Sequence, residues 1–330
     1  RLCARERLAE KCRHGDGRQS LFSLSEIDPH IARLARQPRI GGETMTLPKT
    51  LPSLFLSHGA PTLPLIDTPA RDFLEQIGRE LDRPKAILVA SAHWETAQPT
   101  VSAVETNETI HDFFGFPRPL YDLRYDAPGS PKLAGRAAEL LHAAGFACGI
   151  DRRRGLDHGA WVPLLLMYPQ ADIPVLQLSI QPHAGPGHHL RLGRALAPLR
   201  DEGVLIIGSG SFTHDLSEFR GHGPNDPAPA WVDGFSDWFD ARLTGGRVDE
   251  LLDYRRLAPF AAKNHPTEEH LLPLYVALGA AGKTMRAERL HASATYSVIR
   301  MDAYGFTDAY DARRFHGGRP AAVTDEVGHA

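Results

Sequence analysis

The stretch Ala86 to Ala92, AILVASA, is followed directly by His93 and Trp94 and carries the pattern that decides the fold. A short and nearly continuous apolar run is typical of a strand that is buried on both faces of a sheet. Three similar runs occur elsewhere: Pro52 to Ser57 (PSLFLS), Ile173 to Ile180 (IPVLQLSI) and Val204 to Ser209 (VLIIGS). The sequence therefore predicts at least four buried strands.

Segments with a helical spacing of apolar residues lie between or after these runs. They are Pro131 to Ala144, Ala160 to Tyr168, His188 to Leu199, Ala230 to Leu243 and Thr267 to Gly279. Strands that alternate with helices in this way predict crossover connections. A late alternating run, Ala294 to Met301, predicts one further strand at an edge. We expect an α/β fold with one central sheet, largely parallel or mixed, and helices on both faces.

The two ends of the chain differ from this core. Residues 1–44 are rich in Arg and show no sustained apolar period, which predicts an extension that is disordered or not part of the working protein. Residues 308–330 are polar and punctuated by Gly and Pro, which predicts a tail. We expect residues 45–307 to form a single domain that carries the chemistry.

The composition excludes several classes of function. The 330 residues include 37 Lys and Arg against 40 Asp and Glu, so the formal net charge is −3, and no long basic block suits nucleic acid or an anionic membrane. No apolar run approaches the roughly 18 residues of a membrane-spanning helix, and no apolar signal-peptide core begins the sequence. We expect a cytoplasmic protein with a small-molecule substrate, and a homo-oligomer remains open.

Histidines follow three of the four predicted strands. His58 follows the first run, His93 the second, and His214 comes after the fourth in the stretch GSGSFTHD. Because ligands bind beyond the carboxyl ends of parallel strands, these imidazoles are predicted to share one edge of the sheet. One such histidine is most simply a loop side chain bonded to backbone, but three together favour a metal site. The three Cys residues form no CxxC pair, so nitrogen and oxygen would have to hold the metal.

Two further histidines lie at predicted helix starts. His270 follows Pro266, Glu268 and Glu269, and the two acidic residues are explained by the helix dipole, whereas a cationic histidine is not. A neutral, metal-bound His270 would suit this position. His158 precedes another helix and is predicted to face the substrate or to support a ligand. The remaining histidines that we weighed are interpreted as structural or solvated: His111, His142, His183, His188, His189, His222 and His291.

Eight motifs together resemble a known family over about residues 51–300. They are SHGAP (57–61), SAHWE (91–95), TIHDF with GFP (109–117), YDAPGSP (125–131), DHGAW (157–161), QLSI (177–180), THDL (213–216) and PTEEHLLPL (266–274). In this order they closely resemble the class III extradiol ring-cleavage dioxygenases of the DOPA 4,5-dioxygenase branch, in the LigB superfamily.

The resemblance implies one α/β domain that binds one divalent metal, Fe(II) for catalysis and often found as Zn(II). Carried over by motif, His58, His93 and His270 are the implied metal ligands. His214 is the implied catalytic base beside the metal or a candidate fourth ligand, and His158 is the implied catalytic histidine that faces the substrate. The wider class III group uses a carboxylate as third ligand, so Glu269 is the alternative to His270.

The implied reaction is the opening of a catechol ring, DOPA-like, by O2 to a muconic semialdehyde-type product. Three protein ligands on one face of the metal leave room for the diol and O2, and an imidazole can accept the diol proton. Trp94 is predicted to bind substrate, and it could wall an aromatic pocket together with Phe113, Phe116 and Trp161, although such rings more often pack in cores.

Two other functions use the same histidines. A zinc hydrolase would use bound water as nucleophile and Glu268 or Glu269 as base. A non-catalytic metal-binding protein, like the Memo proteins of the same architecture, would need only the ligands. No dinucleotide fingerprint, phosphate-binding loop, nucleophile elbow or HExxH motif occurs in the sequence.

Overall fold

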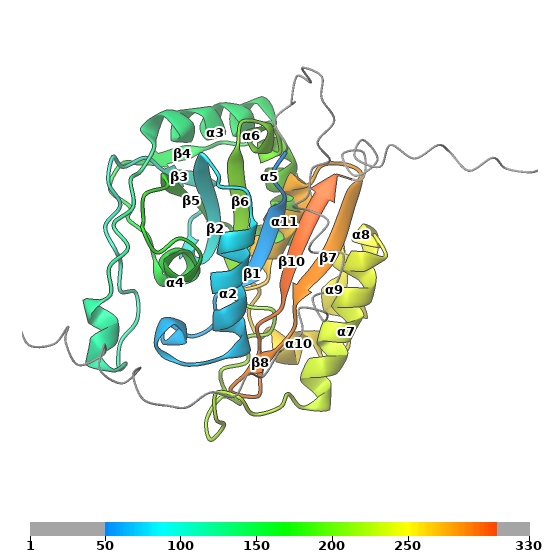
Figure 1. Ribbon diagram of the computed structural model, residues 1–330. Helices are drawn as coiled ribbons and strands as arrows, with labels where there is room; N and C mark the ends of the chain where they lie inside the picture. The colour runs from blue at the N-terminus through cyan, green and yellow to red at the C-terminus, as the bar shows by residue number, and fades with distance from the viewer. Residues whose placement is uncertain (1–49, 309–330) are drawn as a thin grey trace, which may run out of the picture. The chain divides into compact units, whose positions relative to one another are not determined.

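A mixed eight-stranded sheet forms the centre of the computed structural model, which describes residues 50–308 (Figure 1). In sheet order the strands are β4 (Gly149–Asp151), β3 (Thr100–Ser102), β5 (Val175–Ile180), β2 (Ala86–Glu95), β6 (Val204–Gly210), β1 (Ser53–Ser57), β10 (Ala303–Asp308) and β7 (Met285–His291). The neighbours β5, β2, β6 and β1 run parallel, and they are the four strands that the apolar runs predict. The predicted α/β class is therefore confirmed.

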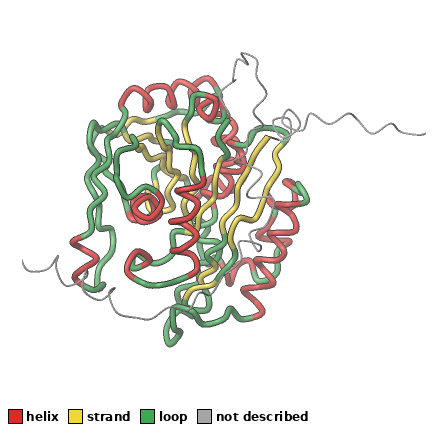
Figure 2. Tube along the Cα trace, viewed as in Figure 1, coloured by secondary structure: helices red, strands yellow, loops and turns green. Residues whose placement is uncertain are grey.

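Helices cover both faces of this sheet, as expected (Figures 1 and 2). The α-helices are α2 (Pro69–Glu80), α3 (Pro131–Ala143), α4 (His158–Met167), α5 (Gly185–Leu196), α6 (Pro198–Asp201), α7 (Ala230–Thr244), α8 (Val248–Leu252), α9 (Tyr254–Leu257), α10 (Ala261–Asn264) and α11 (Leu272–Ala280). Three short 3-10 helices span Leu63–Leu65, Arg118–Asp122 and Pro182–Ala184. Within residues 50–308 no helix is both long enough and apolar enough to span a membrane.

Alternation along the strands divides the core into two sides. In β1, Leu54 and Leu56 pack into the cluster that includes α2 and α4. Phe55, between them, packs on the opposite face with residues of α7 and α11. All three side chains are fully buried, because successive side chains of a strand point to opposite faces and each face carries helices.

The structure corrects two of the predicted elements. The helix expected over Thr267 to Gly279 begins at Leu272, where Pro273 occupies the first turn, so Pro266 and His270 lie in the turn before it. The single edge strand expected over Ala294 to Met301 is two short strands, β8 (Ala294–Thr295) and β9 (Ile299–Arg300), which pair outside the large sheet. Positive φ angles of 49° at Tyr296 and 65° at Ser297, two of the three residues between these strands, reverse the chain there.

Several elements were not predicted. They are the strands β3, β4, β7 and β10, the helices α2, α8, α9 and α10, and the three 3-10 helices. The extension predicted for residues 1–44 lies outside the described residues, as does the predicted tail apart from Asp308, which ends β10.

Candidate metal centre

Three neighbouring strands deliver histidines to one edge of the sheet. β1 and β2 both pair in parallel with β6, so the three carboxyl ends lie side by side. His58 follows β1, His93 is the third residue from the end of β2, and His214 comes four residues after β6. The backbone N–H of His58 donates to the carbonyl of Gly210 at 2.9 Å, which fixes the first of these loops to the end of β6.

The turn before α11 brings His270 to the same edge. The N–H of Ser211 donates to the carbonyl of His270 at 2.9 Å. The close approach requires glycine in β6, since a Cβ on Gly210 would lie 2.0 Å from that carbonyl oxygen and a Cβ on Gly208 would lie 2.0 Å from the carbonyl oxygen of Pro273. The GSG stretch thus admits the backbone that carries His270.

The fifth histidine, His158, opens α4. Its predecessor Asp157 caps the helix and is fully buried. The Asp157 carboxylate accepts hydrogen bonds from Ser91 at 2.7 Å, Gln177 at 2.7 Å and Arg154 at 2.8 Å. These contacts to β2, β5 and the preceding loop fix the start of the helix beside His93.

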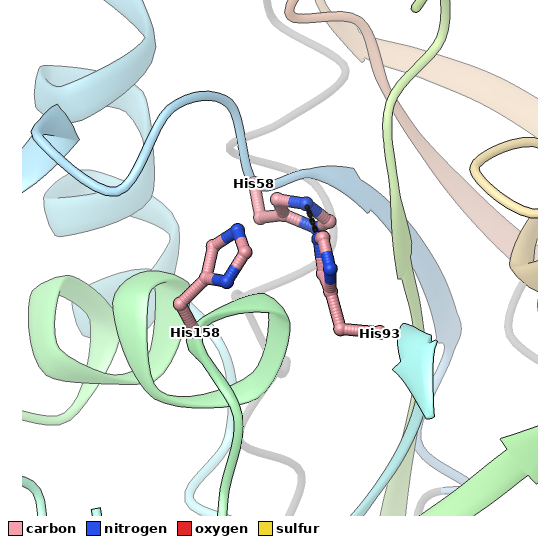
Figure 3. Close-up of side chains that lie close together, drawn as sticks. All are labelled: His58, His93 and His158. Carbon is pink, nitrogen blue, oxygen red and sulfur yellow. Dashed lines mark hydrogen bonds between the residues drawn. The ribbon is translucent and has the colours of Figure 1, made fainter. Parts of the chain in front are cut away.

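The Nε2 atoms of three histidines converge. Nε2 of His93 lies 3.0 Å from Nε2 of His58 and 3.2 Å from Nε2 of His270. Figure 3 shows the first of these contacts, with His158 facing the pair. Imidazole nitrogens that bind one metal at roughly 2.0–2.1 Å are on the order of 2.9–3.4 Å apart. The observed separations therefore match those of ligands around a common ion.

Proton counting leads to the same conclusion. The Ser209 hydroxyl donates to the carbonyl of Gly159 at 2.5 Å, so it accepts from Nδ1–H of His58 at 3.0 Å. Nδ1–H of His270 donates to the Glu269 carboxylate at 2.9 Å. In the neutral rings both Nε2 atoms are therefore unprotonated, and His93 has one Nε2 proton at most to offer to the two of them. Such converging lone pairs suit a cation, and the outer hydrogen bonds resemble those that orient metal-binding histidines.

The protonation state is also suitable. Burial and neighbouring imidazoles, His93 among them, lower the pKa of His58 well below its usual value. Burial and His214 do the same to the pKa of His270. The pKa of His93 is lowered to about 4, chiefly by burial and by His158. Imidazoles with these pKa values are neutral at pH 7, which is the form that binds a metal.

The structure places the other predicted residues around this triad. The ring of His214 stacks on that of His270 with 3.4 Å between centroids, and burial lowers the pKa of His214 to about 4. Asp215 accepts hydrogen bonds from the backbone and side chain of Ser217, so it caps the following turn. Trp94 is buried, and the guanidinium of Arg154 lies 5.3 Å from its ring centroid.

Of the aromatic residues considered for a pocket wall, Phe113 lies nearest to the histidines. Its ring centroid is 5.7 Å from that of His158 and 5.4 Å from that of Phe116. Trp161 is fully buried and donates its indole N–H to the carbonyl of Ile110 at 3.0 Å, which is a core role.

Alternative groupings of ligands exist within residues 50–308. His158 has a ring nitrogen within 4.8 Å of those of His58 and His93, and Glu269 forms a similar group with His214 and His270. Nδ1 of His158 is bonded to Asp112, and Oε1 of Glu269 is bonded to Nδ1 of His270. His158 would therefore bind a metal through Nε2, and Glu269 through its other carboxylate oxygen. None of the seven histidines interpreted as structural or solvated belongs to either group in the described part of the chain.

Sequence reasoning did not assign a role to Asp112 or Ser209. Asp112 lies in the TIHDF motif and Ser209 at the end of the fourth apolar run, so both residues stand in segments that the sequence marks as important. Their roles depend on partners far along the chain, 46 residues away for Asp112 and 151 for Ser209.

Comparison with known proteins agrees with this geometry. Residues 52–307 match the family model described as the catalytic LigB subunit of aromatic ring-opening dioxygenase. The chain is 50% identical over 260 residues to a 4,5-DOPA dioxygenase extradiol of Beta vulgaris, covering 77% of this chain and 96% of that protein. It is 45% identical over 234 residues to a protein of the same name from Escherichia coli, covering 70% and 85%.

A solved structure gives the same picture of the fold. The crystal structure of an uncharacterized protein from Escherichia coli K12 matches with a TM-score of 0.65 and 35% identity, covering 77% of this chain and 99% of that one. The resemblance inferred from the eight motifs is confirmed by these matches. The chain belongs to the family of catalytic LigB subunits of aromatic ring-opening dioxygenases.

Proposed function

We propose that this protein is a metal-dependent extradiol dioxygenase that opens the ring of a DOPA-like catechol with O2 and forms a muconic semialdehyde-type product. The observation that carries the proposal is the convergence of three Nε2 atoms, 3.0 and 3.2 Å apart, in a chain of this family. The names of the relatives support a DOPA-like substrate.

The residues divide into those that hold the metal and those that handle the substrate. His58, His93 and His270 would hold Fe(II), which when bound supplies the redox centre for the reaction of the diol with O2. His158 and His214 flank this triad, and each presents an imidazole that can accept a hydrogen bond or a proton from a catechol hydroxyl. Phe113, beside His158, offers an apolar surface to an aromatic ring.

The test is reconstitution with each metal separately. Protein loaded anaerobically with Fe(II) is expected to consume O2 with L-DOPA and to place both atoms of isotope-labelled O2 in a ring-opened product. Zinc-loaded protein is the matched control and is expected to bind metal without consuming O2. Hydrolase activity with zinc, or metal binding without any turnover, would instead support one of the two rival functions.

The third ligand can be tested by a pair of neighbouring substitutions. His270→Ala is expected to lose stoichiometric metal. Glu269→Ala is expected to retain it with affinity lowered by roughly 10–100-fold, because only the partner of Nδ1 is removed. Glu269→Gln keeps an acceptor oxygen and should lie close to the unmodified protein. Metal content after dialysis decides the matter, and loss of metal only in the Glu269 variants would assign the third ligand to the carboxylate.

The role of His214 is open between base and fourth ligand. As a base, His214→Ala should keep full metal and turn over roughly 10²–10⁴-fold more slowly. The stacked position against His270, with no ring hydrogen bond to another described residue, is consistent with this expectation. Iron content and rate measured on the same preparation separate the two roles, since an empty site would make His214 a ligand.

A further inference from the structure

Asp112 holds His158 at two points. One carboxylate oxygen, Oδ1, accepts the backbone N–H of His158 at 2.9 Å. The other, Oδ2, lies 2.9 Å from the ring Nδ1 of the same residue. The His158 side chain is 8% exposed and that of Asp112 is 21% exposed, although Asp112 as a whole residue lies at the surface. Because hydrogen bonds hold both the backbone and the ring of His158, the imidazole has little freedom to rotate.

The hydrogen bond between Asp112 and the ring also determines which nitrogen of His158 carries the proton. An ionised carboxylate has no hydrogen to donate, so Nδ1 of His158 must be the donor. An aspartate of ordinary pKa is ionised at neutral pH, and Oδ1 of Asp112 already accepts the backbone N–H of His158, so Oδ2 accepts from Nδ1–H of the ring. In the neutral imidazole the second nitrogen, Nε2, is then unprotonated and can only accept.

The ring lies beside the residues proposed to hold the metal. Its centroid is 3.9 Å from that of His93 and 5.3 Å from that of His58, which it meets edge-on at 83° (Figure 3). The ring centroid of Phe113 lies 5.7 Å from that of His158. A catechol placed among these groups would bring its hydroxyls close to His158.

We propose that Asp112 is a positioning residue, which keeps His158 as the Nδ1–H tautomer so that Nε2 can accept a hydrogen from a catechol hydroxyl. The catalytic half of this inference rests on the proposed function. The tautomer itself is a property of the protein and can be measured without turnover.

The decisive variant is Asp112→Asn, which has nearly the same shape. Asp112 accepts from two donors through two oxygens, whereas an asparagine has one acceptor oxygen and one NH2 group. If its oxygen keeps the backbone N–H, its NH2 faces the ring and favours an unprotonated Nδ1, which moves the proton to Nε2. Asp126→Asn is the matched control, because Asp126 bonds the hydroxyl of Thr109 at 2.8 Å in the neighbouring segment.

Two readouts are taken on each protein. Nitrogen-15 NMR of the zinc-loaded form reports the tautomer, with the His158 signals assigned by their absence in His158→Gln. The unmodified protein and Asp126→Asn should show His158 protonated at Nδ1, and Asp112→Asn should show a proton shifted to Nε2 or shared between the two nitrogens. In the iron form Asp112→Asn should lower kcat by ~10-fold or more at unchanged metal content and with a small change in KM. Asp112→Glu, which restores a carboxylate, should recover the tautomer and part of kcat.

Each outcome bears on one part of the inference. An unchanged tautomer in Asp112→Asn overturns the positioning role, whether or not the protein opens catechol rings. A changed tautomer with full kcat overturns the catalytic half. Loss of metal in Asp112→Asn also overturns the proposal, because Oδ2 lies 3.7 Å from Nδ1 of His93 and Asp112 would then support a ligand instead. If Asp112→Asn does not fold, a tautomer that differs from the unmodified protein in Asp112→Glu overturns it as well.

Discussion

His58→Ala and His93→Ala are each expected to abolish stoichiometric metal binding and ring opening while the protein stays folded. The triad has three imidazoles, and removal of one should cost more affinity than the roughly 10–100-fold lost with an outer hydrogen-bond partner. The sheet does not depend on either side chain, because β1 and β2 are held by apolar residues on both faces and by parallel pairing with β6.

Metal content after dialysis against trace metal, circular dichroism and the rate of O2 uptake are measured together. His222→Ala serves as control, because His222 is partly exposed and its nearest carboxylate is Asp226 at 3.7 Å. It should retain both metal and rate. A fully metallated and active His58→Ala protein would show that the Nε2 convergence has another cause.

The centre of the fold was predictable because burial on both faces leaves a direct mark in sequence. Four continuous apolar runs gave the four parallel strands. β7, with the sequence MRAERLH, alternates charged and apolar residues at the edge of the sheet, and β3 and β4 have three residues each. Such segments become strands because they pair with neighbouring strands, and the local sequence pattern does not reveal these partners.

The histidines were predictable for a different reason. The carboxyl ends of parallel strands lie at the same edge of the sheet. Side chains that follow those strands are therefore close together even where the conformation of the loops is unknown. The start of α11 was misplaced because Pro266 and Pro273 both satisfy the preference for proline in a first turn. The backbone N–H groups of Leu271 and Leu272 donate to the carbonyl of Glu268 at 2.9 and 3.1 Å, which shows that a turn precedes the helix.

Gly210→Ala is expected to disrupt the proposed metal centre without changing the side chain of a proposed ligand. The new Cβ would lie 2.0 Å from the carbonyl oxygen of His270, which is backbone and cannot turn aside. The turn would have to move away from β6, weakening the bond from Ser211 N–H to the His270 carbonyl and shifting Nε2 of His270 away from that of His93. Overpacking of this kind costs about 1–3 kcal/mol of unfolding free energy, and occasionally more.

Gly135→Ala adds the same methyl group, but we expect it to change the unfolding free energy in the opposite direction. Gly135 lies within α3, and a Cβ there would meet no atom within 4 Å. Replacing an unconstrained helical glycine with alanine should raise the unfolding free energy by about 0.5–1 kcal/mol and leave metal affinity unchanged. Urea unfolding and zinc titration of both variants therefore separate the loss of backbone approach from the addition of a methyl group. Equal metal affinity in the two variants would mean that the position of His270 does not depend on the contact between its turn and the end of β6.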